Sequence, residues 1–252
     1  TYTVTEDITL TAKARIQPII KSFTTASNNT LMGNSGIAKT DVTSIVFENS
    51  INIPNGATSW DVSAVTNSGV VMAWVVSDGN DGYVLHIGGN GGVIANSNSS
   101  NIFRDFTNVT SINFNDYYDT SSVTNMSNMF RDCSSLASLD LGNNFDTSSV
   151  TTMTQMFWGC TALTTIYASD DFDVTGVTSS SNMFSGATNL VGGNGTAVAT
   201  KRVYNKTYAK VDRANQEGYF TDGTVPIINN VATTKTTNSI TLTVTATEAG
   251  DS

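Results

Sequence analysis

Residues 136–157 read LASLDLGNNFDTSSVTTMTQMF, and this stretch decides the fold because it recurs along the chain with a period of 27 residues. Its clearest landmark is the apolar pair at its end. That pair stands at Ile102-Phe103, Met129-Phe130, Met156-Phe157 and Met183-Phe184. The other apolar positions keep the same register without a slip. We therefore expect four matching units that stack and bury apolar ladders on one another.

Each unit has two halves. The first half, Leu136–Leu141, has the pattern L-x-x-L-x-L, which is typical of the strand of a leucine-rich repeat. The second half, Asp146–Phe157, places apolar residues at i, i+3, i+6 and i+7, as expected for a short helix or 3₁₀ turn with an Asp/Ser/Thr cap. The sequence thus predicts a β-rich α/β solenoid, a right-handed coil of 27-residue repeats. Its parallel strands would lie at Val109–Phe114, Leu136–Leu141 and Leu163–Ala168.

Composition excludes several classes of protein. The chain has 252 residues, a net charge of −9 and only 13% charged residues, and it is rich in Ser, Thr and Asn. No Lys/Arg cluster marks a nucleic-acid surface, and no apolar run is long enough to span a bilayer. Two Cys and one His leave little material for a zinc site. We therefore expect no cofactor and no catalytic metal, and a histidine-dependent nucleophile would have to use His86.

The repeat phrase carries a family resemblance. Residues 119–141, DTSSVTNMSNMFRDCSSLASLDL, and residues 87–106, IGGNGGVIANSNSSNIFRDF, resemble the BspA-like leucine-rich-repeat surface proteins of bacteria. The resemblance extends over residues 37–222. It implies export and display on the bacterial cell surface, often as one module of a long adhesin-like chain, and it implies no catalytic residues.

The resemblance and the flanking patterns divide the chain into five parts. These are the end of a small β module (residues 1–14), a linker (15–36), a β-rich N-terminal cap (37–101), the leucine-rich repeats with a C-terminal cap (102–222), and an incomplete segment (223–252). The last part resembles the start of an immunoglobulin-like or fibronectin type III sandwich, because residues 239–246 alternate strictly. We expect the sequence to be an excerpt of a longer chain.

Two surfaces are candidates for binding. Trp158 takes a position held by Arg and Ser in the other units, so we expect it to face solvent, where exposed aromatic residues often form contacts. The alternative is that Trp158 lies flat on a neighbouring coil. The second surface is the outward side of the strands, where Asn113, Asp140 and Tyr167 would form one ladder.

Four further features have mainly structural interpretations. Cys133 and Cys160 take one buried position in successive units, and parallel side chains there are too far apart for a disulfide. A stack of Asp residues is interpreted as a repeated helix cap, each before a Ser/Thr-rich turn, with a calcium ladder as the alternative interpretation; its members are Asp119, Asp146 and Asp173. Residues 77–83, SDGNDGY, predict a hairpin turn in preference to a calcium loop. His86 stands in a strand with no nucleophile nearby.

These observations predict a non-enzymatic extracellular module that acts in adhesion by binding a host or bacterial surface protein or a glycan. A first alternative is a subunit of a surface fibre, assembled by addition of the terminal strands, Thr1–Ala14 or Ile240–Ala246, to another chain. A second is a glycosidase with two Asp residues, which would need a deep cleft with facing carboxylates. No carboxylate pair in the sequence has a spacing that supports it.

Overall fold

The computed structural model describes residues 17–22, 31–33, 35–64, 69–169 and 172–223, and the backbone of two further strands, β11 (Ile227–Lys235) and β12 (Ile240–Thr247). The predicted strand within Thr1–Ala14 lies outside the described residues. β11 and β12 pair with each other in antiparallel fashion as a separate two-stranded sheet.

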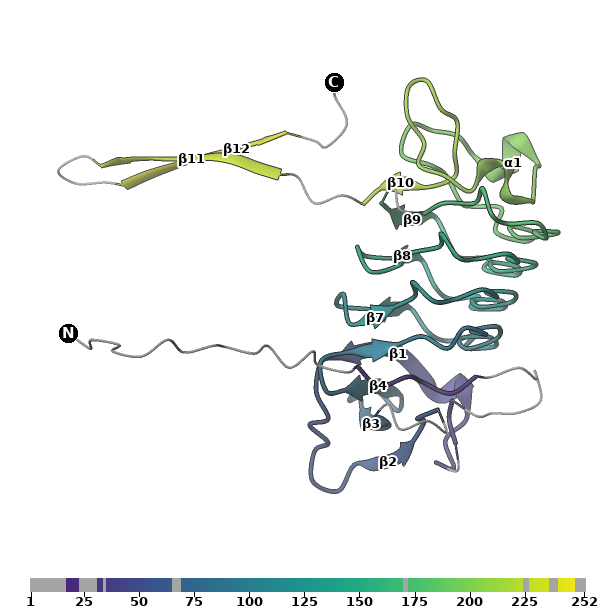
Figure 1. Cartoon of the computed structure of the whole chain (residues 1–252), viewed down its shortest axis with the longest axis vertical. Coiled ribbons are helices and arrows are strands. Elements are labelled where there is room, and N and C mark those ends of the chain that lie inside the picture. Colours follow the sequence, from purple (N-terminus) through teal and green to yellow (C-terminus); the bar gives the residue numbers. More distant parts are fainter. Residues whose placement is uncertain are drawn as a thin grey trace, which may run out of the picture.

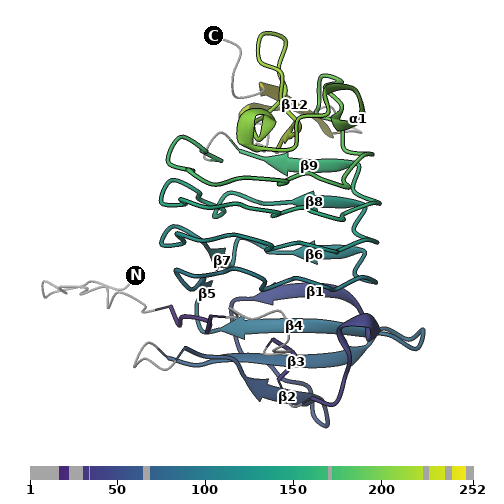
Figure 2. The ribbon, with the colours of Figure 1, turned by 90° about the vertical axis from the view of Figure 1, so that its right-hand side faces the viewer.

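The N-terminal part of the described chain forms a mixed five-stranded sheet in the order β2-β3-β4-β1-β6 (Figures 1 and 2). Its strands are β1 (Val42–Glu48), β2 (Thr58–Asp61), β3 (Val71–Ser77), β4 (Tyr83–Gly89) and β6 (Ser111–Asn113). β2, β3 and β4 are antiparallel neighbours, whereas β1 runs parallel to both β4 and β6. β6 belongs to the first repeat unit, so this sheet joins the N-terminal part to the repeats.

The other strands of the repeats and of the segments that flank them are short. β8 (Ser138–Asp140) and β9 (Thr165–Ala168) are parallel, and β10 (Thr221–Asp222) adds to β9 as a third parallel strand. β5 (Val93–Ile94) and β7 (Tyr118–Asp119) form a separate parallel pair. Figure 2 shows β2, β3, β4, β1, β6, β8 and β9 one above another along the long axis. β6 and β8 are neighbours there, yet they belong to different sheets.

Backbone hydrogen bonds join each repeat unit to the next in the half that follows the strand. The N–H groups of alternate residues donate to carbonyls 26 residues further along. Between the unit of β6 and the unit of β8 the donors are Met126, Asn128, Phe130 and Asp132, at 2.8–2.9 Å. Matching bonds run from residues 99–105 to residues 125–131 and from residues 153–159 to residues 179–185. All these donors point toward the C-terminal neighbour, so the bonds share one direction along the stack.

The backbone in this half is bent by residues in the left-handed region. One such position has φ between 55° and 62° and is held by Asn101, Asn128, Gln155 and Asn182. The other has φ between 60° and 89° and is held by Asp105, Asp132, Gly159 and Gly186. Asn, Asp and Gly tolerate this conformation best. A helix cannot continue through such residues, and in each set the N–H groups of the first three donate to the next unit.

The predicted β-rich α/β solenoid is therefore wrong. Within the described residues the only α-helix is α1 (Val198–Lys201), four residues long and outside the repeats, and the strands are divided among four small sheets, one of them mixed. The segment Asp146–Phe157, predicted as a helical turn, consists of non-helical turns and of Thr152, which forms isolated bridges to Asn125 and Ser179. The predicted strand Val109–Phe114 is reduced to β6, which pairs with β1 and not with β8.

Stacked aromatic rings fill the interior of the repeats. Phe157 lies between Phe130, at 5.4 Å and an interplanar angle of 3°, and Phe184, at 5.6 Å and 9°. Phe103 extends the row at the N-terminal end, where Phe47 of β1 meets it edge-on. At the other end Tyr219 meets Phe184 edge-on. Perpendicular rings thus close the row at both ends, which is a favourable aromatic geometry.

The C-terminal end of the stack is closed by residues 190–223. The buried carboxylate of Asp212 accepts hydrogen bonds from the N–H groups of Asn194, Thr196 and Gly218 and from the Thr196 hydroxyl, at 2.8–3.2 Å. These bonds tie two loops together. Phe220 packs edge-on against Phe172 at 4.8 Å, so this segment covers the last apolar side chains.

Candidate functional site

The outward side of the repeat strands is polar because side chains alternate along a strand. In β6, β8 and β9 the central residues Ile112, Leu139 and Ile166 are buried. Their neighbours point outward and include the predicted ladder residues Asn113, Asp140 and Tyr167, all exposed. The alternation in the sequence therefore predicted correctly which side of these strands faces solvent.

The register places these residues in one row. Asp140 and Tyr167 are direct partners in the β8–β9 pair. Asn113 is one 27-residue period before Asp140 and pairs with Val46 of β1. The Tyr167 side chain is 39% exposed, and it is one of three large hydrophobic residues in the described chain with such exposure, beside Val70 and Val191.

A pocket of about 380 Å³ opens between β6 and β8, which belong to different sheets. Asn113 and Asp140 both line it, and its polar side chains are exposed, so the pocket is open to solvent. The full lining comprises Ser111, Ile112, Asn113, Phe114, Asn115, Asp116, Ser138, Asp140, Gly142, Asn143 and Gly223. Tyr167 lies next to the pocket, because it is the direct strand partner of Asp140.

Local hydrogen bonds fix the two loops that wall the pocket. The Asn113 side chain accepts the N–H of Asn115 at 3.0 Å, and Asp140 Oδ1 accepts the N–H of Gly142 at 2.9 Å. Asp116 Oδ1 accepts the N–H of Asn143 at 2.9 Å and so links the loop after β6 to the loop after β8. A Cβ at residue 142 would lie 2.8 Å from Asp116 Oδ1 and φ there is +68°, so glycine fits this position.

The pocket offers hydrogen-bonding groups of several kinds. Hydroxyls come from Ser111 and Ser138, amides from Asn113, and carboxylates from Asp116 and Asp140. No Lys or Arg is among the residues that line it. The arrangement can therefore bind a polar ligand that is uncharged, and it repels anions.

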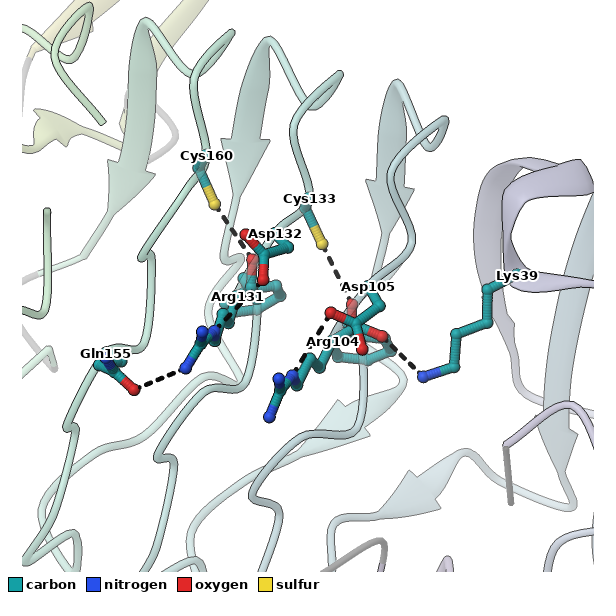
Figure 3. A network of polar contacts seen from close by, with 10 residues as sticks. Lys39, Arg104, Asp105, Arg131, Asp132, Cys133, Gln155 and Cys160 are labelled. Carbon is teal, nitrogen blue, oxygen red and sulfur yellow. Dashed lines mark hydrogen bonds and ion pairs between the residues drawn. The ribbon is translucent and has the colours of Figure 1, made fainter. Parts of the chain in front are cut away.

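Trp158 lies elsewhere in the repeat, seven residues before β9. The Arg131 guanidinium stands over its ring, with Cζ 4.4 Å from the ring centroid, and the Trp158 side chain is half-buried. Arg131 also bonds Asp132 at 3.2 Å and the Gln155 side chain at 2.8 Å (Figure 3). One face of the indole is thus already covered by a cation–π contact. This contact with the neighbouring unit favours the alternative interpretation, in which Trp158 lies flat on that unit.

One end of the network in Figure 3, at Lys39 and Arg104, caps the N-terminal end of the stack. Lys39 Nζ donates to the Arg104 carbonyl at 2.7 Å and stands 5.2 Å from the Phe106 ring centroid. Burial lowers the pKa of Lys39, which the nearby Asp105 partly offsets. The aligned carbonyls of the stack point outward at this end. A positive charge beside them is favourable, as it is at a helix C-terminus, because it meets the negative end of the peptide dipoles.

Cys133 and Cys160 are free and fully buried. Each Sγ donates to a carbonyl 30 residues earlier, of Phe103 and Phe130 respectively, at 3.1 Å. Burial raises the pKa of Cys160 to about 12 and raises that of Cys133 as well. These thiols are core groups that resist ionisation.

The stacked Asp residues cap turns. Asp119, Asp146 and Asp173 each accept, through Oδ1, the N–H two residues further on, at 2.7–2.9 Å. Each Asp thus closes a local turn, and the predicted helix cap is wrong because no helix follows these residues. Within the described residues, no group of three or more His, Cys, Asp or Glu side chains could hold a metal ion.

The two N-terminal candidates also have structural roles. The predicted hairpin at residues 77–83 is confirmed, since β3 and β4 are antiparallel and Asp78 Oδ1 accepts the N–H groups of Asn80 and Gly82. His86 stacks on Trp74 at 5.2 Å, and its Nδ1 lies 3.0 Å from Glu48 Oε1. Both contacts position the His86 ring on the sheet.

The sequence reasoning missed the loop residues of the pocket, Asn115, Asp116 and Asn143. The signal was present, because the turn-forming pairs Asn115-Asp116 and Gly142-Asn143 are one period apart and directly follow the strands. None of the long, apolar helices that a membrane span requires occurs in the described part of the chain.

One comparison with known proteins gives a match. Residues 97–217 match the protein family described as "Mycoplasma protein of unknown function, DUF285". The match covers the repeats and most of the closing segment, a little under half of the chain. It fits the resemblance to a bacterial repeat protein in a general way, without confirming the leucine-rich-repeat or fibronectin type III assignments. No curated protein and no solved structure matches the chain.

Proposed function

We propose that this chain is a non-enzymatic binding module of a bacterial surface protein, and that it acts in adhesion. The observation that carries the proposal is the open polar pocket between β6 and β8, with the exposed Tyr167 beside it. Binding residues lie on a rigid scaffold there, since hydrogen bonds fix both pocket loops and stacked rings join the units that carry β6 and β8.

The surface location is supported by the resemblance to BspA-like proteins and by the match to a family of Mycoplasma proteins. The composition also fits an exported module, because the chain is rich in Ser, Thr and Asn and has a net charge of −9. High net charge of one sign keeps a displayed protein from associating nonspecifically.

The pocket favours binding over hydrolysis. A glycosidase needs a protonated carboxyl group and a second carboxylate that faces it across the scissile bond, in a cleft that encloses the sugar and the attacking water. Here Asp116 and Asp140 are exposed, and each uses Oδ1 to hold a loop N–H group.

Binding to cells tests the proposal. Fluorescently labelled full-length chain is added to epithelial cells and to immobilised extracellular-matrix proteins and glycans. We expect saturable binding to at least one of these targets, with Val191→Thr as a control that removes an exposed apolar side chain outside the pocket. Absence of saturable binding to every target, or release of sugar from the glycans by the chain, would overturn the proposal.

A further inference from the structure

We propose that the pocket between β6 and β8 binds one uncharged hexose unit of an oligosaccharide, with the Tyr167 ring packed against the sugar. This inference rests on the proposed function and names the ligand class of the same site. It is carried by the size of the pocket, its hydrogen-bonding groups, its charge and the exposed aromatic residue beside it.

The size of the pocket suits one sugar unit. Sites for small ligands usually have volumes of about 300–1,000 Å³. At about 380 Å³ the pocket lies at the lower end of this range, and it is open to solvent. The remaining units of an oligosaccharide can therefore extend away from the protein without a clash.

The polar groups match the hydroxyls of a sugar, which both donate and accept hydrogen bonds. Asp116 and Asp140 each engage Oδ1 with a loop N–H, while Oδ2 of each has no hydrogen-bond partner among the described residues. Two fixed acceptors are thus available, together with the hydroxyls of Ser111 and Ser138. Because the loops are already held in place, little ordering is needed when a ligand binds.

Tyr167 supplies the apolar contact. A pyranose ring has a face of C–H groups, and such a face packs on an aromatic ring while the hydroxyls reach polar neighbours. Tyr167 is the direct strand partner of Asp140, so its ring and a pocket carboxylate stand side by side on the same surface. At 39% exposure the ring is accessible to a ligand.

Charge selects against acidic sugars. Two carboxylates and no basic side chain line the pocket, so a sialic acid or a sulfated sugar would be repelled.

The same surface is unsuited to a protein partner. Protein interfaces centre on clustered, buried aromatic and Arg anchors. The described surface has only three exposed large hydrophobic residues, of which Tyr167 alone is aromatic.

A glycan array tests the inference. The biotinylated full-length chain is displayed on streptavidin, because multivalent display raises the avidity of a weak single site. The array carries oligosaccharides that end in galactose, glucose, mannose or N-acetylglucosamine, the sialylated and sulfated forms of the galactose series, and matrix proteins. We expect binding to at least one uncharged series and at least tenfold weaker binding to the sialylated and sulfated forms.

Two variants address the site without disturbing the fold. Tyr167→Asn introduces the residue that stands at the equivalent position in the first repeat, and Asp140→Asn keeps an acceptor for the Gly142 N–H. Each is expected to weaken sugar binding at least tenfold. Val191→Thr, the matched exposed apolar control, and Trp158→Ser, which follows the fourth repeat, should change it less than twofold. Circular dichroism checks that all four variants remain folded.

The outcomes separate this inference from the proposed function. Binding to matrix proteins but to no sugar would overturn the sugar pocket and leave the adhesion module standing. Binding to nothing would overturn both. Sugar binding that is lost in Trp158→Ser and kept in Tyr167→Asn would place the site elsewhere, and a preference for sialylated sugars would contradict the charge argument.

Discussion

Replacement of Phe157 by alanine tests whether the row of stacked rings holds the repeats together. The side chain is fully buried and contacts the rings of Phe130, Phe184 and Phe220 at 5.4, 5.6 and 6.5 Å. Burial of about 150–200 Å² of aromatic surface, at about 25 cal/mol per Å², contributes about 4–5 kcal/mol. Measured Phe→Ala losses in protein cores, about 3–5 kcal/mol, agree with this figure.

We therefore expect Phe157→Ala to lower the free energy of unfolding by about 3–5 kcal/mol. The assay is urea denaturation followed by far-ultraviolet circular dichroism. Phe157→Leu, which keeps most of the apolar volume and loses the ring contacts, should cost about 1–2 kcal/mol. A loss below about 1.5 kcal/mol for the alanine variant would refute the reasoning, because so small a cost is unlike the removal of a ring from a packed core.

Three further predictions concern the repeats. Burial raises the pKa of Cys160 from about 9 to about 12, so the unfolded chain releases this proton at a lower pH than the folded chain does. Stability should therefore fall as the pH rises between these values, by up to about 1.4 kcal/mol per pH unit for each thiol. It should fall less in the double variant Cys133→Ala/Cys160→Ala. Gly159→Ala should cost more than about 1 kcal/mol, since φ is +75° and the new Cβ would lie 2.4 Å from Asp132 Oδ1; an unchanged melting temperature would contradict this. Lys39→Met should cost about 1–3 kcal/mol in urea denaturation, because it leaves the Arg104 carbonyl without its donor.

Periodicity predicted the buried positions and the outward row well. The 27-residue register alone places Ile112, Leu139 and Ile166 inward, and Asn113, Asp140 and Tyr167 outward, which is what the burial pattern shows. Such positions follow from the sequence because burial of apolar side chains dominates the energetics of stacking.

Helical spacing misled the prediction for the other half of the unit. The apolar residues of Asp146–Phe157 fit a helix, yet Gln155 has φ of +56° and its N–H donates to Ser181 of the next unit. A hydrogen bond to a neighbouring coil is not visible in local spacing. The recurrence of Asn, Asp and Gly at two fixed positions was the available signal, because these residues adopt the left-handed conformation most readily.

The break between sheets was also beyond the sequence. β6 lies in phase with β8, so its pattern predicts that the two strands pair. β6 pairs with β1 along one edge, and no ladder joins its other edge to β8. The pocket opens between β6 and β8, and nothing in their shared pattern predicted this break.

Mapping of a bound oligosaccharide onto the chain by NMR tests the central claim most directly. Backbone amide shifts are followed while the uncharged oligosaccharide that binds best on the array is added to isotope-labelled, full-length chain. The pocket and its aromatic neighbour predict concentration-dependent shifts at Asn113, Asn115, Asp140, Asn143 and Tyr167, and little change at Arg131 and Trp158. Shifts centred on Arg131 and Trp158, or none at the pocket at saturating sugar, would contradict the assignment of this surface as the binding site.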